Sequence, residues 1–77
     1  MLMSINPTSN PLYWEATYAI ARRLIDVYPD VAVETVGVEQ LHRWIVSLPE
    51  FADDPTLYDA QILSDVLREW FEEISSR

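Results

Sequence analysis

The chain has 77 residues, a length that allows one small domain with a modest hydrophobic core. It carries thirteen acidic and five basic residues, giving a formal net charge of −8, and it has no cysteine. This composition excludes disulfide bonds, thiolate chemistry and zinc–thiolate sites, and so acidic a chain repels the phosphates of nucleic acids.

The first ten residues, M-L-M-S-I-N-P-T-S-N, show no periodic pattern. We therefore expect a flexible arm over residues 1–10 and a single domain over residues 11–77. No apolar run approaches the roughly 18 residues of a membrane span, and no basic segment followed by an apolar one opens the chain. We expect a cytoplasmic protein with neither a membrane nor a nucleic-acid partner.

Apolar residues at spacings of three and four predict a first helix from Pro11 to about Val27, ended by Pro29. Asn10 is its expected cap. Its apolar stripe is expected to hold Tyr13, Ala16, Ile20, Leu24 and Val27, with Trp14 beside it. The β-branched stretch over residues 31–38 then predicts a brief strand or an extended linker, with Gly37 at a turn.

A second helix is predicted over residues 39–48, with Leu41, Trp44, Ile45 and Leu48 on one face. A third is predicted over residues 57–75, begun by Asp54 or by a capping box of Thr56 and Asp59. Its expected apolar face holds Ile62, Leu63, Val66, Leu67, Trp70, Phe71 and Ile74. Three main helices with at most a short extended segment predict a mostly α domain. A compact bundle and a reduced winged-helix domain both fit this pattern.

Enzyme chemistry is poorly supplied, and we expect a non-enzymatic protein. The chain has one histidine, no cysteine, no lysine and no glycine-rich loop, and no local motif indicates a catalytic triad. His42 is predicted to lie beside the apolar face of the second helix. A packed or surface role is favoured there over metal ligation.

Carboxylates in three groups are candidate ligands for hard cations or ferrous iron. One group flanks Tyr28-Pro29, one lies on the loop after the second helix, and one lines the last helix. Their members are Asp26 and Asp30; Glu50, Asp53 and Asp54; and Asp65, Glu69, Glu72 and Glu73. None has the spacing of a calcium loop, and helix caps, turn residues or a solvated face explain each group better than metal binding does.

Three motifs follow one another along the chain: Y-P-D at 28–30, H-x-W-I at 42–45 and F-x-D-D-P at 51–55. Trp14, Asp26, Thr35-Val36, Leu41, Leu48, Ile62-Leu63 and Trp70 with a following acidic pair accompany them. In this order and at these spacings, the pattern resembles the IscX family, small acidic proteins of bacterial iron–sulfur cluster assembly. Ala52, Ala60 and Ser64 stand where the family pattern has acids.

The resemblance implies a modified winged-helix fold and weak binding of Fe²⁺ through surface carboxylates. It also implies docking on the cysteine desulfurase that supplies sulfur, with ferredoxin or the scaffold protein as further partners. On this basis the expected metal residues are Asp26, Asp30, Glu50, Asp53 and Asp54. The expected partner-binding residues are Asp30, Glu34, Glu50, Asp53, Asp54, Glu69, Glu72 and Glu73.

A second hypothesis retains a binding role for the acidic face but assigns the protein no role in metal binding. In it, the domain is an interaction module for another basic partner, including a DNA-binding protein toward which the carboxylates imitate the charge of DNA. Under either hypothesis we expect a monomer.

Overall fold

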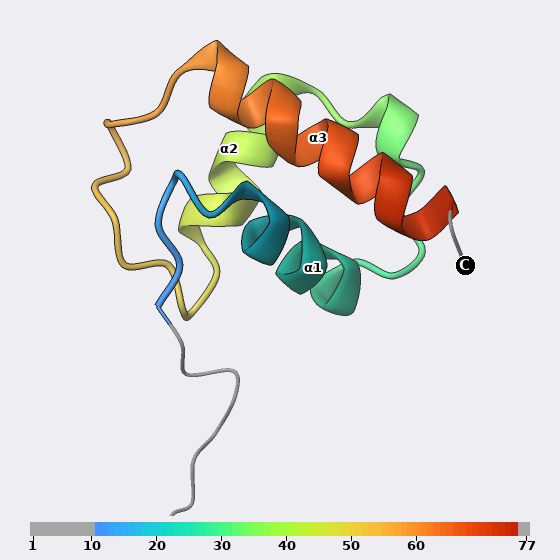
Figure 1. Ribbon diagram of the computed structural model, residues 1–77, viewed down its shortest axis with the longest axis horizontal. Helices are drawn as coiled ribbons and strands as arrows, with labels where there is room; N and C mark the ends of the chain where they lie inside the picture. The colour runs from blue at the N-terminus through green and yellow to red at the C-terminus, as the bar shows by residue number, and fades with distance from the viewer. Residues whose placement is uncertain (1–10, 76–77) are drawn as a thin grey trace, which may run out of the picture.

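The computed structural model describes residues 11–75, which form three α-helices and one short 3₁₀-helix (Figure 1). In chain order they are α1 (Thr17–Val27), η2 (Val33–Thr35), α2 (Val38–Val46) and α3 (Ala60–Ser75). The prediction of a mostly α domain with three main helices is confirmed. The predicted arm over residues 1–10 lies outside the described residues.

The first helix begins at Thr17, so the predicted start at Pro11 is wrong. The backbone N–H of Leu12 donates to the Glu50 carbonyl oxygen, and the N–H of Ala52 donates to the Leu12 carbonyl oxygen, both at 2.9 Å. These bonds form an isolated parallel bridge between Leu12 and Phe51. Because Leu12 uses its backbone groups on a distant segment, they are not available to a helix.

Burial before α1 alternates as it does along a strand. Leu12 and Trp14 are 6 % and 2 % exposed, whereas Tyr13 between them is 45 % exposed. Successive side chains of extended backbone point to opposite sides, which accounts for this period of two. The prediction that Tyr13 belongs to a helical core stripe is therefore wrong. Its neighbour Trp14 is buried in the core.

The stretch after α1 is also more compact than a strand or a fully extended linker. Its middle forms η2, where the Thr35 hydroxyl donates to the Ala32 carbonyl oxygen at 2.7 Å. Val33 and Val36 are buried, and Gly37 directly precedes α2 with an ordinary φ of −81°. Within residues 11–75 the only β pairing is the isolated bridge, so the winged-helix type stays a prediction.

Helix α3 begins at Ala60, three residues later than predicted, because Asp59 is its cap. The Asp59 carboxylate accepts a hydrogen bond from the Ile62 N–H at 2.8 Å, which satisfies a backbone donor that the first turn leaves free. Thr56 does not join Asp59 in a capping box. Helix α2 ends at Val46, two residues before the predicted end, although Leu48 beyond it is buried.

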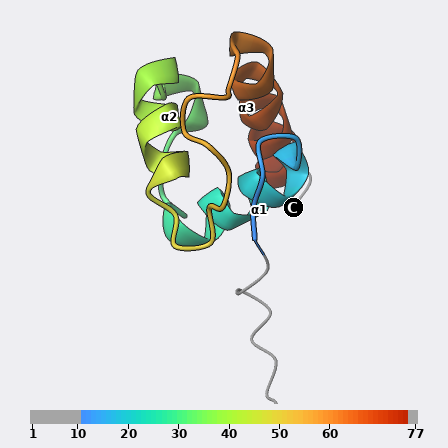
Figure 2. The same cartoon turned by 90° about the vertical axis from the view of Figure 1, so that its left-hand side faces the viewer.

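Helix α3 packs against each of the other helices, most extensively against α1 (Figures 1 and 2). The buried core consists of Leu12, Trp14, Ile20, Ala21, Leu24, Ile25, Val33, Val36, Leu41, Ile45, Leu48, Leu63, Val66 and Trp70. Trp44 is half-buried, stacked on Tyr28 with ring centroids 4.1 Å apart. Like Tyr13, the predicted core residues Val27 and Phe71 are exposed, whereas Ala21 and Ile25 of α1 and the predicted Trp70 of α3 are buried.

The extended start of the domain predicts a stability difference between two neighbouring positions. Leu12→Ala should lower the free energy of unfolding by about 2–4 kcal/mol, because it removes a buried side chain from the core. Tyr13→Ala should lower it by less than about 1 kcal/mol, because that ring is largely in water. Urea denaturation followed by tryptophan fluorescence measures both. A larger loss for Tyr13→Ala than for Leu12→Ala would contradict the extended start.

Candidate functional site

The loop after α2 carries the sequence P-E-F-A-D-D-P over residues 49–55, and we call it the acidic loop. It lies against Trp14, which makes two hydrogen bonds to it. The Trp14 backbone N–H donates to Asp53 Oδ2 at 3.0 Å, and the indole Nε1–H donates to the Asp54 carbonyl oxygen at 2.7 Å. The Phe51 ring meets the indole edge-on, with centroids 4.9 Å apart. A buried tryptophan from before α1 therefore fixes the course of the acidic loop.

The carboxylates of Asp53 and Asp54 are already bonded within this arrangement. Asp53 Oδ1 accepts the backbone N–H of Asp54 at 2.7 Å. Asp54 Oδ1 accepts both the backbone N–H and the hydroxyl of Thr56, at 2.9 and 2.8 Å. These two bonds from Thr56 stabilise the charged form and hold the pKa of Asp54 below its ordinary value of 3.8. Both aspartates shape the loop that presents them.

Glu50, the remaining acid of the loop, forms an ion pair with Arg23 of α1 at 3.1 Å. Only 9 % of the Glu50 side chain is exposed. Its charge is therefore compensated inside the domain, and the pair joins the acidic loop to α1. Glu50, a predicted metal and docking residue, is therefore largely withdrawn from the surface.

The chain over residues 26–34 presents three acids that the domain leaves uncompensated. Asp26, Asp30 and Glu34 are all exposed, and none of the three forms an ion pair within residues 11–75. They lie at the end of α1, in the turn after it and in η2. We call these three residues the acidic corner.

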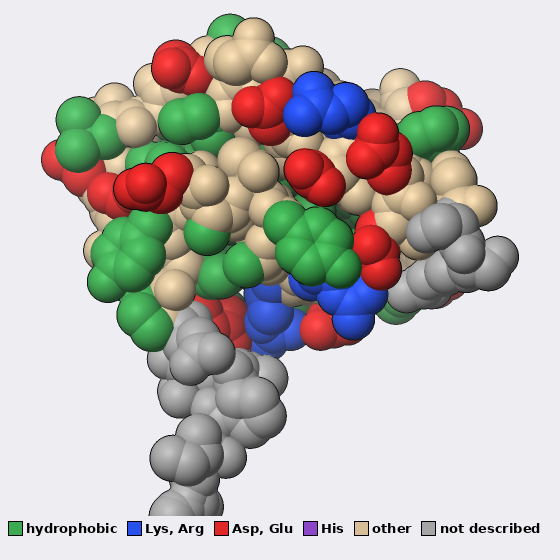
Figure 3. Space-filling model, viewed as in Figure 1, with side chains coloured by type: hydrophobic (Ala, Val, Ile, Leu, Met, Phe, Trp, Pro, Cys, Tyr) green, Lys and Arg blue, Asp and Glu red, His purple; other side chains and the backbone are tan. Residues whose placement is uncertain are grey.

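The acids of α3 divide into two kinds. Glu73 forms an ion pair with Arg22 at 2.8 Å and accepts a hydrogen bond from the Tyr18 hydroxyl at 3.2 Å. Asp65 pairs with Arg68 at 3.1 Å. Glu69 and Glu72 form no ion pair within the part of the chain that the structure describes. On the face of the molecule that Figure 3 shows, acidic side chains are interspersed with arginines and apolar groups.

The five predicted metal residues do not form one ligand set. No group of three or more histidine, aspartate or glutamate side chains is placed to hold a metal ion within residues 11–75. Asp26 and Asp30 have unbonded carboxylates, whereas Glu50, Asp53 and Asp54 are bonded inside the domain. The described geometry does not fit a preformed chelating site, and it leaves single carboxylates at the surface.

His42 packs, as the sequence indicated. Its ring contacts those of Trp14 and Tyr58, with centroids 5.7 and 4.2 Å away, and its Nε2 lies 2.8 Å from the Pro55 carbonyl oxygen. Sequence analysis missed this aromatic cluster because it placed Trp14 on a helix. The signal that could have found it is the alternation of Leu12 and Trp14 with outward residues, which is typical of extended backbone.

The Thr56 bonds predict a specific pKa change. Thr56→Val removes the hydroxyl donor to Asp54 and keeps the backbone donor, so the pKa of Asp54 should rise toward its ordinary value. Because the folded-state pKa is lowered, this carboxylate stabilises the fold above its unfolded-state pKa, and the contribution is lost as pH falls through the folded-state value. Carbon-13 NMR titration of the side-chain carboxyl measures the shift. Thr35→Val is the matched control, because the hydroxyl of Thr35 donates to Ala32 and not to Asp54. An equal pKa of Asp54 in the wild-type protein, Thr56→Val and Thr35→Val would contradict the role of the Thr56 hydroxyl.

None of the helices in the described range is long and apolar enough to cross a membrane.

Comparison with known proteins identifies the family to which the chain belongs. Residues 12–75 match the family described as iron–sulphur cluster assembly. An uncharacterized protein of Pseudomonas aeruginosa is 37 % identical over 62 residues, covering 80 % of this chain and 94 % of that protein. The match takes in Trp14, the acidic corner, the acidic loop and all three α-helices, and the chain therefore belongs to the IscX family of iron–sulfur cluster assembly proteins.

Proposed function

We propose that this domain is a non-enzymatic adaptor of iron–sulfur cluster assembly, which docks on a cysteine desulfurase through its uncompensated carboxylates. Its family supports the role in cluster assembly. A cytoplasmic location and a monomeric state are parts of the same proposal. The assignment of the helical domain to the winged-helix type belongs to the proposal as well, and the resemblance to the family is its only support.

The observation that carries the docking proposal is the division of the acids. Arginines within the domain compensate Glu50, Asp65 and Glu73, whereas Asp26, Asp30 and Glu34 remain exposed and unpaired in the described range. Exposed charge that a protein does not use internally raises the rate of encounter with an oppositely charged partner. The acidic corner is therefore the proposed centre of docking. Glu69 and Glu72 add negative charge on α3, and Asp53 and Asp54 add it on the acidic loop.

We also propose that Fe²⁺ binds weakly, as cargo rather than as a resident cofactor. Asp26 and Asp30 offer unbonded carboxylates, and carboxylate oxygens with water suit ferrous iron. Arg23 lies three residues before Asp26 on α1 and holds Glu50. Side chains three apart are neighbours on a helix surface, so the acidic loop meets α1 near Asp26. Single carboxylates without a preformed cage favour loose and exchangeable binding.

Charge reversal at the acidic corner tests docking. Asp30→Lys should weaken binding to a purified cysteine desulfurase by about five- to tenfold at low salt, because a favourable charge contact becomes a repulsive one. Glu15→Lys is the matched control, since it changes the net charge equally just before α1, whose 11 residues span about 16 Å between it and Asp30. Biolayer interferometry at two salt concentrations measures both. Equal weakening by the two variants would show that net charge alone attracts the partner and would contradict a docking centre at the acidic corner.

Anaerobic titration with Fe²⁺, followed by amide NMR, tests the iron proposal separately. Signals at 26–30 and 50–54 should broaden, and those of α3 should not. Asp26→Asn combined with Asp30→Asn should abolish the broadening, while Glu15→Gln should leave it unchanged. Uniform broadening, or none, would remove the iron role and leave a module for a basic partner only.

A further inference from the structure

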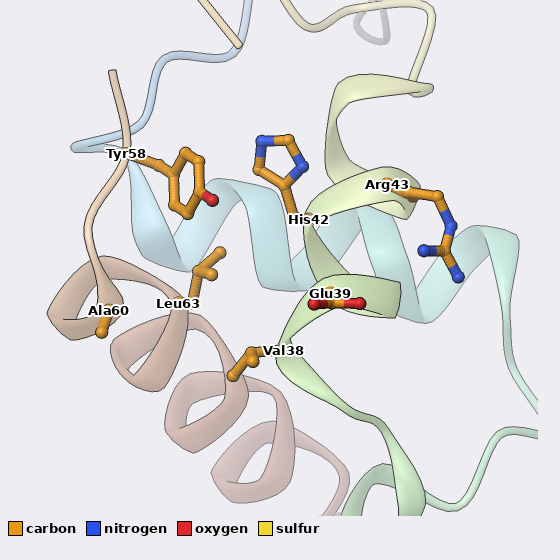
Figure 4. A pocket seen from close by; sticks show the side chains of 7 residues that line it. All are labelled: Val38, Glu39, His42, Arg43, Tyr58, Ala60 and Leu63. Carbon is orange, nitrogen blue, oxygen red and sulfur yellow. The ribbon is translucent and has the colours of Figure 1, made fainter. Parts of the chain in front are cut away.

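The surface between the start of α2 and the start of α3 contains a pocket that the proposed function does not use. Its volume is about 350 Å³, and it is lined by Val38, Glu39, His42, Arg43, Tyr58, Ala60 and Leu63 (Figure 4). Leu63 belongs to the buried core, whereas Val38 and Tyr58 are 53 % and 43 % exposed. Leu57, next to Tyr58 in the chain, is 65 % exposed. Apolar side chains left in water around a hollow are typical of a binding surface.

The pocket wall is held in place by the contacts that order the acidic loop. The Nε2 atom of His42 lies 2.8 Å from the Pro55 carbonyl oxygen, and the Tyr58 ring lies 4.2 Å from the imidazole. Both rings also contact buried Trp14. A wall anchored in the core does not have to be ordered when an occupant arrives, which lowers the entropic cost of binding.

One acidic residue lines the pocket, and a second adjoins the lining in the chain. Glu39 on α2 is exposed and forms no ion pair within residues 11–75. Asp59, which stands between the lining residues Tyr58 and Ala60, is also exposed. Arg43 contributes the opposite charge, but Figure 4 shows its guanidinium directed away from Tyr58, Ala60 and Leu63. The hollow is therefore mostly apolar, with Glu39 as the acidic residue of its lining and Asp59 adjoining the lining in the chain on the α3 side.

We propose that this pocket receives an apolar side chain from a partner protein, in a segment where lysine or arginine flanks that side chain on both sides. Charge complementarity selects the occupant, because basic neighbours would lie over Glu39 and Asp59 while the apolar group fills the hollow. The inference rests on the proposed function only in taking the partner to be basic. It adds a hydrophobic anchor, of the kind that dominates the energy of small interfaces, to an attraction otherwise made of exposed charges.

Titration of the full-length protein with short peptides tests the anchor without any cysteine desulfurase. The probe is a blocked peptide Lys-Arg-Leu-Phe-Arg-Lys, and its matched control is Lys-Arg-Ser-Ser-Arg-Lys, which has the same charge. Amide NMR should show shifts centred on Val38, Tyr58 and Leu63 with the first peptide and much smaller ones with the second. Equal shifts with the two peptides would overturn the proposal, because charge alone would then explain binding.

Variants at exposed positions separate the apolar from the charged contribution. Val38→Ser should weaken binding of the Leu-Phe peptide about three- to tenfold, because apolar contact is lost. Glu39→Gln should weaken it about two- to threefold at low salt and not at high salt. Val27→Ser, at another exposed valine on α1 outside the pocket, is the control and should leave affinity unchanged. An unchanged affinity in Val38→Ser would overturn the anchor.

Two other occupants have distinct signatures in the same sample. Shifts at Val38 and Tyr58 that grow with protein concentration would assign the pocket to a second copy of the chain. Nuclear Overhauser contacts from the methyl groups of Met1 or Met3 to Tyr58 would assign it to the chain's own first residues. Either result would overturn the proposal. The acidic corner is tested with the desulfurase and the pocket is tested with peptides. A negative result in one experiment therefore does not affect the interpretation of the other.

Discussion

The pair of hydrogen bonds from Trp14 to the acidic loop is the constraint on which the rest of the structure depends. The donors come from a residue before α1, and the acceptors belong to Asp53 and Asp54, about 40 positions later. Fixing this loop also fixes the rings of His42 and Tyr58, which pack on the same indole. In a domain of this size, where the core is small, one buried side chain can therefore connect the start of the chain, the loop and the wall of a pocket.

The arrangement sorts the carboxylates by task, although the sequence gives them all the same charge. Those of Asp53, Asp54 and Asp59 accept backbone N–H groups and so determine local structure. Those of Glu50, Asp65 and Glu73 pair with three arginines. The remaining acids have no such internal bond, and the acidic corner holds three of them within nine consecutive residues. Net charge alone overstates the number of carboxylates that have no bond inside the domain.

The sequence predicted what repeats regularly and missed what depends on distant contacts. The 3.6-residue period placed α2 and α3 correctly to within three residues, because amphipathic helices carry their own pattern. The start of α1 was wrong, because Leu12 satisfies its backbone against Glu50 and Ala52, a pairing that no local pattern encodes. The candidate acids were all identifiable, but their division was not. Whether Glu50 meets Arg23, or Asp54 meets Thr56, depends on where the folded chain brings them.

This division bears on what a cation, or a basic partner under the proposed function, would meet at the surface of this domain. A cation bound tightly by Asp54 would compete for the oxygen that holds Thr56, and one bound by Glu50 would have to displace Arg23. Each exchange costs contacts that order the loop and, through Trp14, the core. Asp26 and Asp30 carry no such cost. The same argument favours the proposed docking over chelation. A basic protein surface can approach many carboxylates at once and leave every internal bond in place, whereas a metal ion must coordinate each carboxylate directly.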